Sequence, residues 1–220
     1  SGDVIVAGMD DGRIVLLESC TGEHLLSYCG HSKTVTTVKF NDQSTMLASG
    51  GVENVIKLWD VCSGQCVNTL KGHVKPVSTV LFSSDSTLVA SAATDNDPVR
   101  VWNTGSGDCV VVARNGSASW DIRSLSFSHD GTKVVCGGSL INIFDVCNGD
   151  WRIYWKPNPK GANSVCFSRD SKTIVTALQG ETTVKIWDSK TGNCEYALQG
   201  HQSEVLAALY CADSVKIFSC

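Results

Sequence analysis

The stretch that decides the fold runs from Gly30 to Asp60 and reads GHSKTVTTVKFNDQSTMLASGGVENVIKLWD. Apolar and polar residues alternate in Val35–Phe40 and again in Val55–Trp59, and both runs are rich in β-branched and aromatic side chains. Such alternation is typical of β-strands. The polar residues 41–44 that follow the first run are typical of a tight turn. The stretch therefore predicts short β-strands joined by turns, and no segment of the chain shows a helical period.

The same pattern recurs along the chain. The tripeptides at the closing position end at successive steps of 42, 43, 42 and 43 residues, and they are Leu16-Leu17-Glu18, Leu58-Trp59-Asp60, Val101-Trp102-Asn103, Ile143-Phe144-Asp145 and Ile186-Trp187-Asp188. A glycine-containing turn follows each of them. A fixed period in this range indicates a repeat architecture. We expect four strands in each period, and the 220 residues hold about 5.2 periods.

The composition is that of a folded protein without a strongly basic surface. The chain is 42% hydrophobic and 18% charged and has only 4 prolines, so we expect it to bury a core. A formal net charge of −4 argues against a nucleic-acid or anionic-membrane surface. No apolar run approaches the roughly 18–20 residues of a membrane helix, and nothing at the start of the sequence resembles a signal peptide, so we expect none. Ser1 stands where an initiator methionine would be, so we do not expect it to be the native start.

Across nearly its whole length the chain resembles WD-repeat β-propellers. Gly-His opens a repeat at residues 30–31, 72–73 and 200–201, and Trp-Asp or a variant of it closes a repeat about 28–30 residues later. The resemblance implies an all-β fold of four-stranded antiparallel blades around a central channel. We expect one propeller domain over residues 1–220 with about five blades, the first and last incomplete. The repeats are expected near 1–29, 30–71, 72–114, 115–158, 159–199 and 200–220.

Both ends of the chain are expected to form incomplete blades. The first repeat begins with second-strand sequence at Asp3–Val6, so its first strand is missing. The last repeat has a first strand, Val205–Tyr210, and then Ser214–Phe218, which resembles the third strand Val184–Trp187, so a second strand looks absent. We favour a truncated or spliced piece of a propeller that in this family usually has seven blades. The alternative is that Val205–Tyr210 completes the first blade and closes a ring of five.

The resemblance also implies a buried hydrogen-bond set in a blade, made of His, Ser or Thr, Asp and Trp. It is expected in the third repeat from His73, Ser91, Asp95 and Trp102, and in the second from His31, Ser49, Glu53 and Trp59. The other repeats lack members, as where Phe144 replaces Trp, and should rely on apolar packing. His73, Ser91 and Asp95 could be taken for a catalytic triad, but a triad needs an exposed nucleophile beside an oxyanion site. We therefore expect a structural role, no catalytic residue and no enzymatic activity.

Eleven cysteines are spread over the repeats without any C-x-x-C pair. Six of them occupy two repeat positions, with Cys66, Cys109 and Cys194 at one and Cys20, Cys62 and Cys147 at the other. Cysteines that share a repeat position are expected to lie in different blades. Unpaired thiols are typical of a reducing compartment, so we expect a cytoplasmic or nuclear protein in which the sequon at Asn115 is not glycosylated. Cys62 and Cys66 flank one turn but have no third and fourth ligand, which is a weak zinc signal. We expect no metal and no cofactor, since a phosphate-binding glycine-rich loop is also missing.

Loops at the mouth of the channel are the expected partner-binding face, because the narrower face is a common partner site in the WD-repeat family. The positions concerned are the start of each first strand and the turn after each second strand. They hold Thr34, Thr36, Pro76, Ser78, Asp121, Arg123, Gly161, Asn163, Glu204 and Leu206, with Asp10, Val52 and Thr94 in the turns. Trp120, Asp121 and Arg123 stand out, because Trp and Arg are enriched in interface hot spots. The alternative is that Asp121 pairs with Arg123 on the surface and Trp120 only fills space.

Two further surfaces are candidates for partner contacts. One is the acidic loop Asp95–Pro98, which is one residue longer than its counterpart in the second repeat. The other is the aromatic segment Trp151–Lys156 on an outer strand, since exposed strand edges with aromatic residues invite contacts. The alternative for this segment is burial against a neighbouring blade.

These observations favour a non-catalytic protein–protein interaction scaffold or adaptor. Its partners would be other proteins, with no nucleic acid, membrane or small-molecule substrate. The alternatives are a regulatory module of a larger signalling or ubiquitin-ligase protein and a propeller enzyme. Substrate receptors of cullin-type ligases often carry Trp-Asp-x-Arg, but here the arginine position holds Cys20, Cys62, Gly105, Cys147 or Lys190. An enzyme would bring titratable residues to the mouth, whereas this mouth consists mainly of Thr, Pro, Ser, Gly and Asn.

Overall fold

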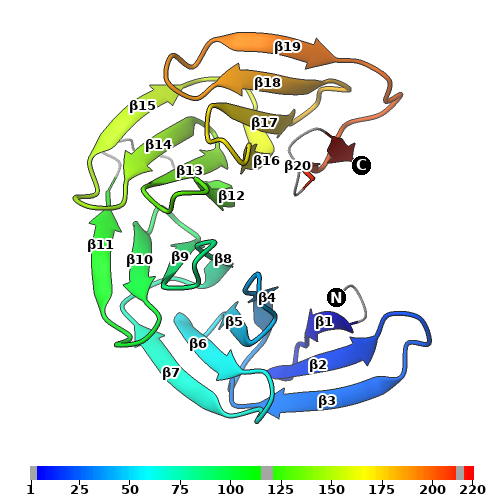
Figure 1. Ribbon diagram of the computed structural model, residues 1–220, viewed down its shortest axis with the longest axis vertical. Helices are drawn as coiled ribbons and strands as arrows, with labels where there is room; N and C mark the ends of the chain where they lie inside the picture. Colours follow the sequence, from blue (N-terminus) through cyan, green and yellow to red (C-terminus); the bar gives the residue numbers. More distant parts are fainter. Residues whose placement is uncertain (1–3, 115–120, 212–215) are drawn as a thin grey trace. The chain divides into compact units, whose positions relative to one another are not determined.

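The computed structural model describes residues 4–114, 121–211 and 216–220 (Figure 1). Within these ranges the regular structure consists of strands, which form six sheets. Each strand lies beside its neighbour in the sequence, so every sheet is a meander (Figure 1). This confirms the expected all-β architecture of short antiparallel blades. The described residues contain no helix that is long and apolar enough to cross a membrane.

The chain divides into two compact units, Ser1–Val110 and Val111–Cys220, with the division inside β11. Unit 1 begins with the three-stranded sheet β1 (Val4–Gly8), β2 (Arg13–Glu18) and β3 (His24–Cys29). The second sheet contains β4 (Val35–Phe40), β5 (Met46–Gly51), β6 (Val55–Asp60) and β7 (Cys66–Lys71). The third sheet contains β8 (Val77–Phe82), β9 (Leu88–Ala93), β10 (Val99–Asn103) and β11 (Cys109–Ala113). The prediction of a single domain stays a prediction.

Unit 2 contains two complete blades and a two-stranded sheet. The fourth blade is β12 (Ile122–Phe127), β13 (Lys133–Gly138), β14 (Ile141–Asp145) and β15 (Trp151–Trp155). The fifth is β16 (Ala162–Phe167), β17 (Thr173–Leu178), β18 (Val184–Asp188) and β19 (Cys194–Leu198). The last sheet is β20 (Ala208–Tyr210) with β21 (Ile217–Ser219). The incomplete first and last blades are therefore confirmed.

The register of the last sheet corrects one expectation. Ala208 of β20 pairs with Ser219 of β21 in the register that joins first to second strands elsewhere, as Val38 pairs with Ser49. His201 also bonds Ser219 across 18 residues, the same separation as between His31 and Ser49. The strand Ile217–Ser219 is therefore a second strand, and its assignment to the third strand was wrong. The residues Lys-Ile-Phe resemble Lys-Ile-Trp, but the pairing partner decides the strand's place in the blade.

The same register bears on the proposed ring of five. That alternative requires the edge of β20 to be free for β1, the second strand of the first blade. In the structure β21 occupies this edge through the pairs Ala208–Ser219, Leu209–Phe218 and Tyr210–Ile217. β21 therefore fills the place of the second strand beside β20, and the ring of five stays an open alternative. The seven-bladed parent stays a prediction.

The core of each unit lies between neighbouring blades. In unit 1 the Trp59 ring is buried against Tyr28 of the preceding blade, with ring centroids 5.7 Å apart. In unit 2 Trp155 packs against Trp187 in the same way at 5.8 Å. Gly50 on β5 lets the inner strands of neighbouring blades lie close together, because a Cβ at this position would lie 2.5 Å from Cγ1 of Val77 in the next blade. Aromatic residues on the outer strands and glycines on the inner strands thus fit the blades together.

Candidate functional site: buried networks and an exposed polar face

The second blade holds a complete hydrogen-bond network between strands β5 and β6 and the loop before β4. Trp59 Nε1 donates to Ser49 Oγ at 2.8 Å, and Ser49 Oγ lies 2.6 Å from His31 Nε2. His31 Nδ1 lies 2.6 Å from Glu53 Oε1. The structure thus brings the four expected residues together, and the longer Glu reaches where Asp is usual. Glu53 also accepts bonds from the backbone N–H and the hydroxyl of Ser32, which ties the turn to the loop.

The third blade has an equivalent network, but its acid is Asp97. His73 Nε2 lies 2.8 Å from Ser91 Oγ, which accepts a 2.8 Å bond from Trp102 Nε1. His73 Nδ1 lies 2.9 Å from Asp97 Oδ2, which also accepts the backbone N–H of Val74. The expectation that Asp95 would fill this place was wrong.

The reason for this correction lies in the loop. Asp95 and Asn96 both adopt left-handed backbone conformations, with φ of 54° and 65°. The two residues form an outward bulge, so Asp97 occupies the buried place. Asp95 is exposed and pairs instead with Lys75 Nζ at 3.1 Å. The acidic loop 95–98 therefore contributes one structural and one surface carboxylate.

Burial sets the protonation state of both histidines. Desolvation lowers the pKa of His31 and of His73 below the ordinary value, against the opposing effect of Glu53 and Asp97. A neutral imidazole that donates Nδ1–H to the carboxylate leaves Nε2 as an acceptor for the serine hydroxyl. Ser91 and Ser49 are fully buried, so neither is placed as a nucleophile that a substrate could reach.

The remaining blades of unit 2 have reduced networks. Trp187 Nε1 donates to Thr176 Oγ1 at 2.8 Å in the fifth blade, where Gly161 and Ala162 stand in place of Gly-His. Phe144 replaces Trp in the fourth blade and is fully buried, with its ring 5.1 Å from Trp151. Apolar contacts thus replace the polar set there.

Unit 1 places its part of the expected partner face in loops fixed by backbone hydrogen bonds. Thr34 Oγ1 donates to the carbonyl of Asp10 at 3.2 Å, and Ser78 Oγ donates to that of Ala92 at 3.2 Å. The hydroxyl of Thr36 bonds the carbonyls of Gly50 and Val77. In the turns, the backbone N–H of Val52 donates to the carbonyl of Thr34, and the backbone N–H of Thr94 donates to the carbonyl of Pro76. These hydroxyls are already used within the fold, so they offer few donors to a partner.

Unit 2 joins several expected residues into one exposed polar network around Arg123. Arg123 Nε donates to Asp121 Oδ2 at 3.1 Å, and its Nη1 donates to Asn163 Oδ1 at 3.3 Å and to Gln179 Oε1 at 2.9 Å. Asn163 Nδ2 donates in turn to Glu204 Oε1 at 2.9 Å. We call these five residues the Arg123 network. Asp121 does pair with Arg123, yet Arg123 also reaches two other segments.

Electrostatics within the Arg123 network favour the ionised form of Glu204. The backbone N–H of Gly180 and the amide of Asn163 lower the pKa of Glu204, and the positive charges of Lys160 and Arg123 add to this effect. Leu206, also expected on this face, is 65% exposed beside the network. Trp120 lies outside the described residues.

Gln179 was missing from the residues expected at this face. Its backbone N–H donates to the carbonyl of Gly161, just as Val52 bonds Thr34 and Thr94 bonds Pro76. The repeat position therefore contained the signal, since Gln179 follows the second strand as Val52 and Thr94 do. Lys160 was also not anticipated, because its effect on Glu204 depends on the fold of the loop around Gly180.

The outer-strand segment Trp151–Lys156 is partly buried. Trp151 donates its indole N–H to the carbonyl of Arg114 at 2.8 Å, and Trp155 is packed against the core of the fifth blade. Tyr154 is 74% exposed and remains available to a partner.

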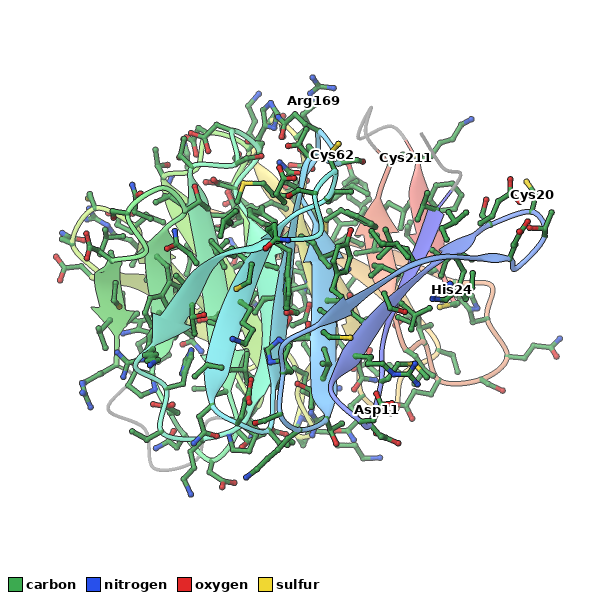
Figure 2. The ribbon with its side chains drawn as sticks, turned by 90° about the horizontal axis from the view of Figure 1, so that it is seen from below. Asp11, Cys20, His24, Cys62, Arg169 and Cys211 are labelled. Atoms are coloured by element: carbon green, nitrogen blue, oxygen red, sulfur yellow. The ribbon has the colours of Figure 1, made fainter. Side chains whose placement is uncertain are left out.

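The described residues contain no group of His, Cys, Asp and Glu side chains that could hold a metal ion. None of the eleven cysteines forms a disulfide. Figure 2 shows Cys20 and Cys62 in the hairpin turns of two different blades of unit 1.

Comparison with known proteins gives a family match. Residues 22–60, 64–103 and 155–188 match the family model described as WD domain, G-beta repeat. The chain is 31% identical over 192 residues to pre-mRNA-processing factor 19 homolog 2 of Arabidopsis thaliana, covering 86% of this chain and 36% of that protein. It is 28% identical over 214 residues to eukaryotic translation initiation factor 3 subunit I of Coccidioides immitis (strain RS), covering 91% and 44%.

A third relative is the WD repeat and SOCS box-containing protein 1 of Xenopus tropicalis. The identity is 31% over 122 residues, which cover 54% of this chain and 29% of that protein. The chain thus spans less than half the length of each of these curated relatives.

Proposed function

The chain belongs to the WD-repeat family, and from this membership we propose that it is a non-catalytic scaffold that binds a partner protein through the Arg123 network. WD-repeat domains act as protein-interaction modules, and a rigid β-scaffold with fixed loops is suited to recognition.

The observation that carries the proposal is the set of bonds made by Arg123. One side chain links its own strand β12 to Asn163 of β16 and to Gln179 in the turn after β17. Side chains held by several bonds lose less entropy on binding than free ones. The network also combines a guanidinium, two carboxylates and two amides on an exposed surface, which gives a partner donors and acceptors in fixed positions.

Charge reversal tests this proposal, with a matched pair as the control. Asp121→Arg with Arg123→Asp should remove partner proteins that the tagged full chain captures from cells, as measured by affinity purification and mass spectrometry. The control is Asp11→Arg with Arg13→Asp, since Asp11 and Arg13 form an equally spaced, exposed ion pair at 2.7 Å in unit 1 (Figure 2). The same partners recovered with both double variants would overturn the proposal. Circular dichroism checks that both variants are folded.

A regulatory module within a larger protein is the second candidate. It is supported by the similarity to a protein whose name includes a SOCS box beside its WD repeats. The sequence argues against a substrate receptor of a cullin-type ligase, because no repeat has arginine at the position two residues after Trp-Asp. Affinity purification of the full-length parent protein distinguishes the candidates, because a ligase module would recover ligase subunits.

We further propose a cytoplasmic or nuclear location. Eleven cysteines without a disulfide are typical of a reducing environment. Imaging of the tagged parent protein tests this, and secretion into the medium would contradict it.

A further inference from the structure

The last sheet, β20 with β21, is held to the fifth blade by little apolar burial. Among the described residues from 204 to 220, only Val205 and Ala208 are buried, and Phe218 is 64% exposed. In β17, by contrast, every residue after Thr173 is buried. Because apolar burial is the main force that packs one sheet on another, the last sheet should dock less tightly than a complete blade.

Hydrogen bonds to β16 and β17 dock the last sheet on the fifth blade, and Figure 1 shows β20 beside these two strands. The hydroxyl of Thr173 lies 2.9 Å from that of Tyr210. Ser164 Oγ donates to the carbonyl of Ala208 at 3.2 Å and accepts its N–H at 3.4 Å. Thr173 begins β17, whereas Gln179 of the Arg123 network follows the end of β17. The bond of Tyr210 therefore lies at the opposite end of β17 from this network.

At the other end of β17, the Arg123 network takes part in the docking. Asn163 Nδ2 donates to Glu204 Oε1 at 2.9 Å and to the carbonyl of Val205 at 3.5 Å. The N–H of Val205 in turn donates to the carbonyl of Glu181 at 3.0 Å. Arg123 Nη1 donates to Asn163 Oδ1, and this bond fixes which end of the amide faces Glu204. One amide thus connects the guanidinium of the fourth blade to the loop that leads into β20.

The proposed partner site lies on both sides of this junction. Glu204 and the exposed Leu206 belong to the loop before β20, whereas the other residues of the Arg123 network belong to the fourth and fifth blades. Elements with little buried surface open locally at a low cost in free energy. When the last sheet undocks, Glu204 and Leu206 leave the surface around Arg123. A partner that contacts both sides therefore binds only the docked state, and by linkage it must favour docking.

We propose that the last sheet docks on the fifth blade and undocks from it as a unit, and that its docking completes the partner site. Docking places Glu204 and Leu206 beside Arg123, and the amide of Asn163 couples the two sides. The partner is that of the proposed function, on which this proposal rests, whereas the coupling is a property of the free chain. In the free chain the bonds of Arg123 stabilise the docked sheet.

Hydrogen exchange of the full chain, followed residue by residue with NMR, tests the coupling without a partner. The N–H groups of Val205 and Ala208 bond groups of the fifth blade, so their exchange rates report undocking. Arg123→Gln should raise both rates several-fold, although Arg123 bonds neither residue in the described structure. Tyr210→Phe removes the bond to Thr173 at the far end of β17 and should raise both rates as well.

Matched substitutions elsewhere in unit 2 are the controls for the exchange rates. Arg152→Gln removes an exposed guanidinium that pairs with Asp145 in the fourth blade. Tyr196→Phe removes a hydroxyl from a side chain of β19 that is 61% exposed. Both controls should leave the exchange of the last sheet unchanged. Unchanged rates in Arg123→Gln, or an equal rise in Arg152→Gln, would overturn the coupling.

Two charge substitutions on neighbouring residues of β20 test the effect on the partner. Ala208 is buried in a cluster with Val175 and Val184, so Ala208→Asp should undock the sheet, because an unpaired carboxylate is costly to bury. Leu209→Asp puts the same charge on a neighbour that is 51% exposed and is the control. The tagged full chain with Ala208→Asp should lose the partner proteins that charge reversal in the Arg123 network loses. Leu209→Asp should retain them.

The outcomes separate this proposal from the proposed function. Circular dichroism checks that the variants fold, and if Ala208→Asp does not, Tyr210→Phe replaces it with Tyr196→Phe as its control. Full capture of the partners by a folded variant whose last sheet exchanges fast would overturn the proposal and leave the Arg123 site intact. If charge reversal in the Arg123 network loses no partner, the proposed function fails, and the role of docking in partner binding fails with it.

Discussion

His73 Nδ1 lies 2.9 Å from Asp97 Oδ2, while Asp95, two residues earlier, is turned outward toward Lys75. The two carboxylates of one loop therefore differ in what their loss would cost. Asp97 is buried and accepts bonds from His73 and from the N–H of Val74, so its removal leaves the buried Nδ1–H of His73 and the partly buried N–H of Val74 without their acceptor. Asp95 forms an exposed ion pair, and such pairs contribute little to stability.

Alanine substitution should separate these two residues. Asp97→Ala is expected to lower the free energy of unfolding by about 2–3 kcal/mol, because buried donors lose their acceptor. Asp95→Ala should change it by less than about 0.5 kcal/mol. Urea unfolding followed by tryptophan fluorescence measures both. Equal losses for the two variants would show that Asp97 is not the acid of this network.

The buried histidines predict a stability that falls in mild acid. The pKa of His31 and of His73 is lowered by burial in the folded state, so the unfolded chain binds more protons just below its ordinary histidine pKa. Stability should therefore be retained above about pH 6.5 and decrease as the pH falls below it. His73→Gln should be less stable at neutral pH but show a weaker decrease. Thermal unfolding between pH 7.5 and 5 measures the slope, and a stability that rises over this interval would contradict the argument.

Repeat spacing predicted most of the fold but not the details within a loop. The steps of 42 and 43 residues are enough to place the blades, because every blade buries the same apolar positions of its strands. Asp97, and not the expected Asp95, bonds His73, because Asp95 and Asn96 adopt left-handed backbone conformations that turn the loop outward. The amino-acid sequence does not show directly where a loop with an inserted residue will bulge. Phe218 was placed on the wrong strand, because strand identity depends on the pairing partner and not on local resemblance.

Repeat spacing also did not predict the hydrogen bonds of the residues on the expected partner-binding face. Thr36 and Ser78 were expected on the partner-binding face, yet both donate their hydroxyls to backbone carbonyls of their own unit. Arg123 was expected to stand out, but its bonds to Asn163 and Gln179 connect segments about 40 and 56 residues apart. Such contacts between repeats depend on side-chain length and direction, which the repeat position alone does not give.

The close approach of inner strands predicts a steric effect in unit 2. A Cβ at Gly137 would lie 2.5 Å from Cγ1 of Val165, so Gly137→Ala should destabilise the protein by about 1–3 kcal/mol through overpacking. Gly105→Ala is the control, because its Cβ would meet only the side chain of Asn103 at 3.5 Å. Chemical unfolding of both variants measures the difference. A second change, Val165→Ala, should relieve part of the Gly137→Ala loss, and strict additivity would argue against the proposed contact.

Binding to the captured partner should depend on the Arg123 network more than on the hydroxyls of unit 1. Arg123→Gln removes the charge and the bonds to Asp121 and the two amides, so we expect the Kd to rise about tenfold or more, as at an interface hot spot. Ser78→Ala should change the Kd less than about threefold, because its hydroxyl already bonds the carbonyl of Ala92. Titration calorimetry with the purified partner measures both values. If Arg123 contributes through its charge, the association rate of the wild type should also fall with added salt, and that dependence should weaken in Arg123→Gln. Equal affinities of the two variants would place the partner on another surface.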